Sequence, residues 1–219
     1  MTKWNIHYVR TTGSTNDDAF RAGTAGAPAG LVITAEEQTA GRGRLNRSWH
    51  SPRGAGLYVS ALVRPGIPAE RAGLLSFCSA NAMRSAAEEC GLKGAVVKWP
   101  NDLIAGGKKI CGILSACRIL EERLDFAVIG TGLNLKCGSY PEELSDRAGC
   151  LEEMGILPDR ETLLHRYLEQ LEFQIRALEE TPIRVLEETR AHCITLGREV
   201  LVSGETELRG TAREIGPAG

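Results

Sequence analysis

Apolar residues along the chain follow two rhythms, which together predict an α+β fold. Short β-rich runs at 31–35 and 56–63 are bounded by Gly, Pro or charged residues and are typical of buried strands. Four further apolar runs fill 95–135, and they are joined at Gly106-Gly107 and around Glu121-Glu122. Such spacing is expected of an antiparallel meander.

Segments with apolar residues three and four apart predict helices around these strands. The polar run Ser14-Thr15-Asn16-Asp17 suits a helix N-terminus and predicts a helix over about 16–22. A long helix is predicted over 68–90, where Gly91 supplies the C-terminal stop. The other predicted helices cover 141–148, 182–193 and 160–178, the last with an apolar stripe of Leu163, Leu164, Tyr167, Leu168, Leu171 and Ile175.

The end of the chain alternates in a different way and predicts the start of a small all-β domain. Residues 198–216 read as a hairpin around Ser203-Gly204. Two strands alone are marginally stable, so we expect this domain to be incomplete.

Composition indicates an ordinary globular protein that is soluble in the cytoplasm. The 219 residues are 42% hydrophobic and 25% charged, with a formal net charge of -2, which requires neither nucleic acid nor membrane as a partner. The opening MTKWNIHYVR lacks the apolar centre of a signal peptide, and apolar runs fall short of a membrane span. Seven cysteines without a CxxC pair argue against a disulfide framework and a structural zinc site.

The connection between the first two predicted strands is unusually rich in glycine and arginine. The stretch QTAGRGRLNRSWHSPRGAGLY, residues 38–58, holds four of each. Glycines let the backbone approach a ligand closely, while Arg42 and Arg44 carry planar forks suited to phosphate or carboxylate oxygens. A solvated surface loop is the alternative interpretation of this stretch taken alone.

Two more segments bring polar groups to strand ends. In KWPND, Pro100 removes a ladder N–H, so the strand bends and presents Lys98, Asn101 and Asp102 on a turn. Such a trio suits nucleotide chemistry, with Lys98 compensating phosphate charge and Asp102 holding Mg²⁺, although a plain surface turn fits equally well. In GTGLNL, Asn134 ends a strand whose glycines leave room for a ligand or another chain segment. Neither a P-loop nor GxGxxG is complete.

Five motifs in order, STN, AGRGR with Trp49, KWPND, KKICGIL and GTGLNL, resemble the biotin-protein ligases, also called biotin-[acetyl-CoA-carboxylase] ligases. The resemblance covers nearly the whole chain. It implies a mixed, mostly antiparallel sheet flanked by helices, the fold shared with class II aminoacyl-tRNA synthetases and lipoate ligases. It also implies a two-step reaction, in which biotin and Mg-ATP form biotinyl-5'-AMP and a lysine of a biotin carboxyl carrier protein then accepts the biotin.

The resemblance assigns roles to residues at matching positions. Arg42, Lys98 and Lys109 are expected to be catalytic, while the Mg²⁺ expected at Asp102 follows from the KWPND turn itself. Biotin binding falls on Ser14, Thr15, Asn16, Gln38, Arg42, Gly43, Arg44, Lys109 and Gly112. ATP and adenylate binding falls on Arg42, Arg44, Trp49, Lys98, Asn101 and Asn134. Because a mixed anhydride hydrolyses readily, we expect the loop from Gln38 to be a lid, mobile without ligand.

The same resemblance divides the chain and sets its partners. Residues 1–194 are expected to form the biotin- and ATP-binding domain, and 195–219 the start of a C-terminal β-barrel. No helix-turn-helix precedes STN, so we expect no DNA binding, and exposed strand edges allow a homodimer. A lipoate or octanoate ligase is the alternative enzyme. A nucleic-acid binder fits poorly with 5% aromatic residues and a pI near 6.1, and only an assay excludes an inactive relative.

Overall fold

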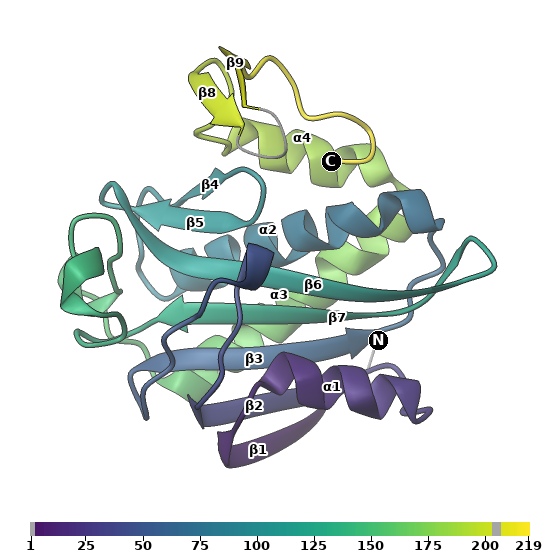
Figure 1. Cartoon of the computed structure of the whole chain (residues 1–219), viewed down its shortest axis with the longest axis horizontal. Coiled ribbons are helices and arrows are strands. Elements are labelled where there is room, and N and C mark those ends of the chain that lie inside the picture. Colours follow the sequence, from purple (N-terminus) through teal and green to yellow (C-terminus); the bar gives the residue numbers. More distant parts are fainter. Residues whose placement is uncertain (1–2, 203–206) are drawn as a thin grey trace.

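A seven-stranded sheet forms the centre of the molecule in the computed structural model, which describes residues 3–202 and 207–219 (Figure 1). Its strands lie in the order β1-β2-β3-β7-β6-β5-β4. They are β1 Asn5–Thr12, β2 Leu31–Gln38, β3 Gly56–Val63, β4 Val96–Lys98, β5 Asp102–Ala105, β6 Lys108–Leu120 and β7 Arg123–Asn134. Only the β1–β2 pair among these is parallel, which confirms the mixed, mostly antiparallel sheet.

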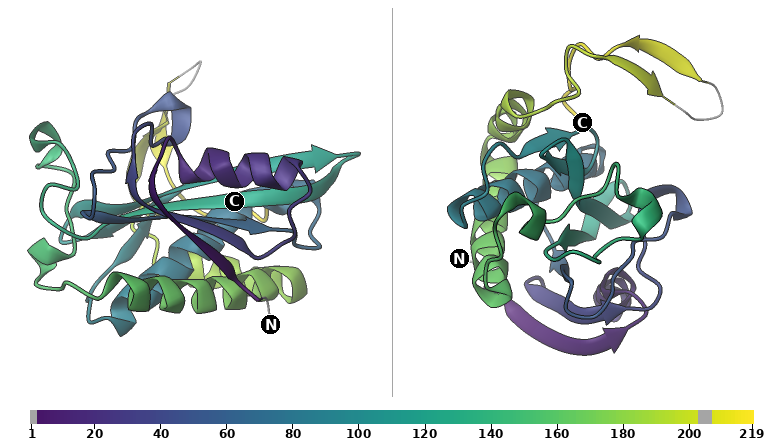
Figure 2. Two further views of the ribbon diagram at one scale, coloured as in Figure 1. Left: turned by 90° about the horizontal axis from the view of Figure 1, so that it is seen from below. Right: turned by 90° about the vertical axis from the view of Figure 1, so that its left-hand side faces the viewer.

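Helices cover both faces of this sheet. The α-helices are α1 Thr15–Thr24, α2 Leu75–Glu89, α3 Arg160–Glu180 and α4 Pro182–Ala191, with short 3₁₀ turns at Arg44–Asn46, Ala69–Leu74, Glu142–Leu144 and Glu152–Met154. Figure 2 shows α1 on one side of the sheet and α3 on the other, where α2 also packs. The interior strand β3 is therefore buried along its whole length.

Two apolar layers result from this arrangement. Leu57 and Val59 on β3 join the larger core beneath α2 and α3, whereas Leu62 joins Phe126 and Ala19 in a smaller core beneath α1. Because strand side chains alternate between faces, one short strand can supply both layers. The face under α1 thus has only a small apolar core, and the rest of it is available for a site.

Helix ends follow the predicted chemistry. The Ser14 hydroxyl caps α1 by accepting a hydrogen bond from the Asp17 N–H at 3.4 Å. Gly91 follows α2 with a φ of 102°, a left-handed conformation that suits glycine. Five residues of the apolar stripe predicted for α3 are buried, and Ile175 is half-buried.

Three features of the fold differ from the predictions. Strand β1 was not predicted, because five of its eight residues are exposed and Ile6 and Val9 are only half-buried. The helix predicted over 68–90 starts as a 3₁₀ turn and becomes α-helical only at Leu75. The helix predicted over 141–148 is wrong except for the turn Glu142–Leu144. Here the backbone leaves helical geometry to pair with β6, as Lys109 N–H donates to the Arg147 carbonyl at 2.8 Å.

The C-terminal segment forms a separate two-stranded sheet. Strands β8 Glu199–Val202 and β9 Leu208–Thr211 pair antiparallel, and the turn predicted at Ser203-Gly204 lies outside the described residues. This hairpin extends from the main body (Figure 2). The domain boundary at 194 and the homodimer stay predictions. In the described part of the chain, every helix is too short or too polar to cross a membrane.

Candidate active site

A cavity of about 1210 Å³ opens on the face of the sheet that carries α1. Its walls come from the α1 N-terminus, the glycine- and arginine-rich loop, the β4–β5 turn, strands β6 and β7, the segment 139–148 and the C-terminal hairpin. All the site residues predicted from the sequence line it: Ser14, Thr15, Asn16, Gln38, Arg42, Gly43, Arg44, Trp49, Lys98, Asn101, Asp102, Lys109, Gly112 and Asn134. The fold therefore brings together residues that are separated by up to 120 positions.

Neutral polar groups gather where α1 begins. The Gln38 amide oxygen accepts hydrogen bonds from the Thr15 N–H at 2.9 Å and from the Thr15 hydroxyl at 3.0 Å. The Thr15 hydroxyl also lies 2.9 Å from that of Ser60, and the Gln38 amide nitrogen donates to the Ser51 hydroxyl at 2.9 Å. These hydrogen bonds hold the four polar side chains in one geometry, as recognition of a small polar ring requires.

Three glycines on β6 and β7 make room for side chains of other segments. A Cβ at Gly130 would lie 2.5 Å from the Asn16 amide nitrogen, which donates to the Leu114 carbonyl at 3.0 Å. Gly112 and Gly132 are register partners, and a Cβ on either would meet the Trp49 indole at 2.8 or 2.4 Å. The Trp49 ring thus fills the space beside Gly112 and Gly132 and lies on a surface free of side chains.

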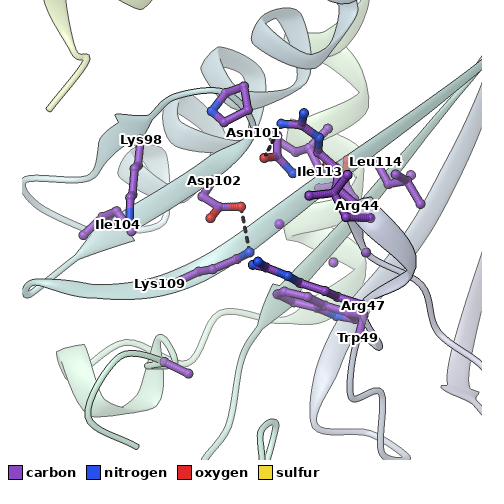
Figure 3. Close-up of a pocket in the computed structure, with 18 of the residues that line it drawn as sticks. Arg44, Arg47, Trp49, Lys98, Asn101, Asp102, Ile104, Lys109, Ile113 and Leu114 are labelled. Carbon is purple, nitrogen blue, oxygen red and sulfur yellow. Dashed lines mark hydrogen bonds and ion pairs between the residues drawn. The ribbon is translucent and has the colours of Figure 1, made fainter. Parts of the chain in front are cut away.

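Lys109 stands at the centre of the charged part of the cavity. Its ammonium lies 2.7 Å from an Asp102 carboxylate oxygen and 5.3 Å from the centroid of the Trp49 ring (Figure 3). This ion pair joins the neighbouring strands β5 and β6. Asp102 on β5 is the register partner of Gly112 on β6, the strand that also carries Lys109. Lys98, the register partner of Asp102 on β4, presents an exposed second ammonium to the same cavity.

Asn101 connects the β4–β5 turn to two other parts of the site. Its amide nitrogen donates to the Ile113 carbonyl on β6 at 2.7 Å, and its amide oxygen accepts from the Arg44 guanidinium at 3.4 Å (Figure 3). The KWPND turn and the glycine- and arginine-rich loop, which were predicted to belong to one site, are therefore in direct contact. Arg42 instead pairs with Asp17 in the first turn of α1, with about half of its side chain exposed.

The loop is fixed at its base and exposed at its tip. The Gln38 N–H donates to the Ser51 carbonyl at 3.0 Å, and the Trp49 N–H donates to the Gly41 carbonyl at 2.8 Å. At the tip, Leu45 is 80% exposed and has a φ of 54°. An exposed leucine buries little apolar surface, and a left-handed conformation is unfavourable for it, so little free energy holds the tip in this position. This geometry suits a lid, whose motion stays a prediction.

Sequence reasoning missed several residues that line the cavity. Arg47 extends beside Trp49 and Lys109 (Figure 3), and its place in the arginine run of the loop was the signal for it. Tyr140 and Arg147 come from the segment 139–148, which carries no motif. Burial and a hydrogen bond to Glu153 raise the pKa of Tyr140, so its hydroxyl stays neutral.

Charge in the cavity is strongly unbalanced. Its described lining residues include six basic side chains, Arg42, Arg44, Arg47, Lys98, Lys109 and Arg147, against two carboxylates, Asp102 and Glu214. The whole protein, by contrast, has a net charge of -2. Concentrating cations in a concave wall raises the local concentration of anions. The site is therefore built for a ligand with negative charge.

The donor set fits Mg²⁺ only if a phosphate ligand is present. Mg²⁺ prefers hard oxygen ligands and often binds through one or two carboxylates, with substrate phosphates and water completing the shell. Asp102 supplies one such oxygen within the cation cluster.

Asn134 is buried and its amide nitrogen donates to the Gly149 carbonyl at 2.9 Å, which fixes the side chain at the cavity wall.

Comparisons with known proteins agree with this geometry. Residues 8–134 match the model of the biotin/lipoate A/B protein ligase family. The chain is 36% identical to the biotin--[acetyl-CoA-carboxylase] ligase of Mycobacterium tuberculosis, over 98% of this chain and 81% of that protein. It is 35% identical to the bifunctional ligase/repressor BirA of Bacillus subtilis, over 85% of this chain but only 59% of the relative's length.

Solved structures give the same result. The biotin protein ligase of Aquifex aeolicus in complex with biotin and ATP has a TM-score of 0.80 and 29% identity, covering 94% of this chain and 86% of that one. The biotin protein ligase of Leishmania major in complex with biotinyl-5-AMP has a TM-score of 0.70 and 25% identity, covering 97% and 98%. Ordered motifs, fold and relatives all agree, and the chain belongs to the biotin/lipoate A/B protein ligase family.

Proposed function

We propose that this protein is an ATP-dependent biotin-protein ligase, which forms biotinyl-5'-AMP and transfers biotin to a lysine of a biotin carboxyl carrier protein. One observation carries the proposal: a fixed neutral polar group, centred on Thr15 and Gln38, shares one cavity with a cluster of cations. Biotin has a neutral ureido ring and an anionic tail, and ATP adds a triphosphate. The cavity offers matching groups to each.

The polar group suits the ureido ring, which needs both donors and acceptors. Hydroxyl and amide side chains supply both kinds of hydrogen bond, and those of Thr15, Gln38 and Ser60 are already positioned by one another. Preorganised groups lose little entropy on binding. Trp49 and the strand glycines beside it add an apolar surface to the site.

Lys109 is the candidate partner for the carboxylate of biotin. Activation requires this carboxylate to approach a phosphate to about 3 Å, and two anions resist that approach. An ammonium already in the cavity lowers the repulsion, and Asp102 holds it in place until the substrate arrives. Arg44, Arg47 and Lys98 lie on the surrounding walls, where they can neutralise the phosphates. Asp102 would hold Mg²⁺ together with substrate phosphates, and the ion would supply further charge compensation.

The loop and Trp49 have roles in holding the intermediate. Trp49 is the candidate contact for adenine, and Arg44 can close the loop over the adenylate while Asn101 holds its guanidinium. A closed loop keeps water from the mixed anhydride until the acceptor lysine attacks. A lipoate or octanoate ligase is not favoured, because the relatives from Mycobacterium tuberculosis, Aquifex aeolicus and Leishmania major are biotin ligases.

Calorimetry followed by an acceptor assay tests the proposal. Biotin should bind to the purified protein, and lipoate at the same concentration should give no heat of binding. With ATP, Mg²⁺ and a purified biotin carboxyl carrier domain, mass spectrometry should show the mass of one biotin added to the acceptor. An acceptor whose target lysine is changed to arginine is the control and should stay unmodified. Absence of biotin binding would overturn the assignment.

A further inference from the structure

Two cysteines and a glutamate meet just beyond the end of β7. The Cys137 and Cys150 sulfur atoms lie 3.9 Å apart, and the Glu152 carboxylate accepts a hydrogen bond from the Cys137 N–H at 2.8 Å. The two sulfur atoms and a carboxylate oxygen all lie within 4.8 Å of one another. Among the described residues, no other group of three or more such side chains is placed this closely.

The spacing of these atoms matches a metal better than a covalent bond. Zn–S bonds of about 2.3 Å at a tetrahedral angle place two sulfur atoms about 3.8 Å apart. A disulfide requires about 2.05 Å, and both cysteines are free here. A carboxylate oxygen is a common third ligand to Zn²⁺, and three protein ligands leave one position for water.

We propose that Cys137, Cys150 and Glu152 form a binding site for a thiophilic divalent cation such as Zn²⁺. On binding, each thiol loses its proton to solvent and its sulfur becomes a thiolate ligand, so no electrons are transferred. Cys150 is buried whereas Cys137 and Glu152 are exposed, which leaves an open side for the ion to enter. This site goes beyond the proposed ligase function and does not depend on it.

The neighbouring charges leave Glu152 available as the ligand. Glu153, the next residue, is already engaged by the Lys108 ammonium at 3.6 Å and by the Tyr140 hydroxyl. Glu152 accepts hydrogen bonds from Cys137, through its N–H at 2.8 Å and through its thiol, whose proton leaves when a metal binds. A carboxylate that accepts one N–H keeps further lone pairs for a metal.

The position of the site gives it a consequence for the cavity. Cys137 and Cys150 stand at the two ends of a segment whose middle supplies Tyr140, Leu144 and Arg147 to the cavity wall. The Ser139 hydroxyl also donates to the Ala55 carbonyl at 2.6 Å, and Lys109 on β6 pairs through its backbone with Arg147 and Gly149. A bound cation would tie both ends together and restrict this wall of the cavity.

Cobalt substitution tests the site without any substrate, so its outcome is independent of the ligase assay. Protein that has been reduced and treated with a chelator is titrated with Co²⁺ alone. We expect one equivalent to produce a thiolate-to-cobalt band in the near ultraviolet together with intense visible bands typical of tetrahedral cobalt. Zn²⁺ should then abolish both sets of bands. A spectrum of hexa-aqua cobalt throughout the titration would overturn the proposal.

Variants assign the bands to the three residues. Cys137→Ser and Glu152→Gln change exposed side chains, and each should weaken Co²⁺ binding more than about 100-fold, beyond the effect of groups that merely support a ligand. Cys90→Ser is the matched control, because it removes a partly buried cysteine elsewhere and should leave binding unchanged. Equal losses in Cys90→Ser, or unchanged binding in Glu152→Gln, would contradict the three-residue site. The site would also be contradicted if Cys137 and Cys150 were isolated as a disulfide and the protein bound no cobalt once that disulfide had been reduced.

Discussion

Replacing Lys109 by methionine separates the charge of this side chain from its bulk. The ammonium lies 2.7 Å from Asp102, and the Lys109 side chain is 34% exposed, so part of its field is screened by water. Two unit charges 4 Å apart at an effective dielectric constant of 20 attract by about 4 kcal/mol, and hydrogen bonds to charged groups contribute about 1.5–3 kcal/mol net. We take the lower range and expect biotin affinity to fall about 10- to 150-fold.

Biotin methyl ester provides the internal comparison, because it keeps the ring and loses the charge. If Lys109 binds the carboxylate, calorimetry should show a large loss for biotin in Lys109→Met and almost none for the ester. Lys93→Ala, which changes an exposed lysine outside the cavity lining, should leave both affinities unchanged. Equal losses for biotin and its ester would refute the carboxylate role and indicate a change in the pocket itself.

The variant also leaves Asp102 without its cation, which is a separate effect. An unpaired carboxylate in a partly buried site lowers stability and repels an anionic ligand. The double variant Lys109→Met with Asp102→Asn removes both charges, and urea unfolding should show stability closer to that of the wild type. If the double variant regains biotin affinity in full, repulsion by Asp102 and not loss of the ammonium explains the single variant.

Three further predictions concern the loop, its contacts and a helix end. Gly132→Ala places a methyl carbon 2.4 Å from Trp49 Nε1, so the indole must move. ATP binding measured by calorimetry should weaken, while the circular dichroism spectrum stays native. Normal ATP affinity would exclude Trp49 as an adenine contact. Arg44→Gly should let biotinyl-AMP escape, seen as biotin on unrelated proteins in a mixture, and wild-type selectivity would count against its role in retention. The Asp159 carboxylate caps α3, and hydrogen bonds from Thr162 lower its pKa. Its stabilising effect is present above the unfolded pKa near 3.9 and disappears as pH falls through the lower folded value. Asp159→Ala should therefore destabilise the protein at pH 7, and in urea titrations this loss should shrink as the pH is lowered below the unfolded value.

Much of the fold was predictable because local signals and burial agree. All eight residues of β3 are buried on a sheet covered on both sides, and the apolar run at 56–63 reports this directly. Strand β1 was missed because its residues alternate only weakly, and its structure depends on parallel pairing with β2 across the intervening helix. The helix predicted over 141–148 failed for a related reason, since pairing with Lys109 overrides local helix preference.

The site was predictable where residues belong to motifs. All residues predicted from the five motifs line one cavity, although the motifs span 14–135. Sequence alone could not show that Gly112 and Gly132 face the Trp49 indole, because that contact depends on the register of β6 and β7. Nor could it identify Tyr140 or Arg147, which reach the cavity only through the path of an irregular segment.

The base of the glycine- and arginine-rich loop has a consequence for how such a site can change over time. Gln38 and Ser51 share two hydrogen bonds, one between backbone groups and one between side chains, so the excursion starts and ends at one fixed point. Residues at the tip such as Leu45 and Asn46 are exposed and contribute little to the core. Substitutions there can alter how ligands are held without disturbing how the sheet folds. The sequence of the loop tip can therefore vary, by selection or by design, and change how firmly an intermediate is retained without changing the stability of the fold.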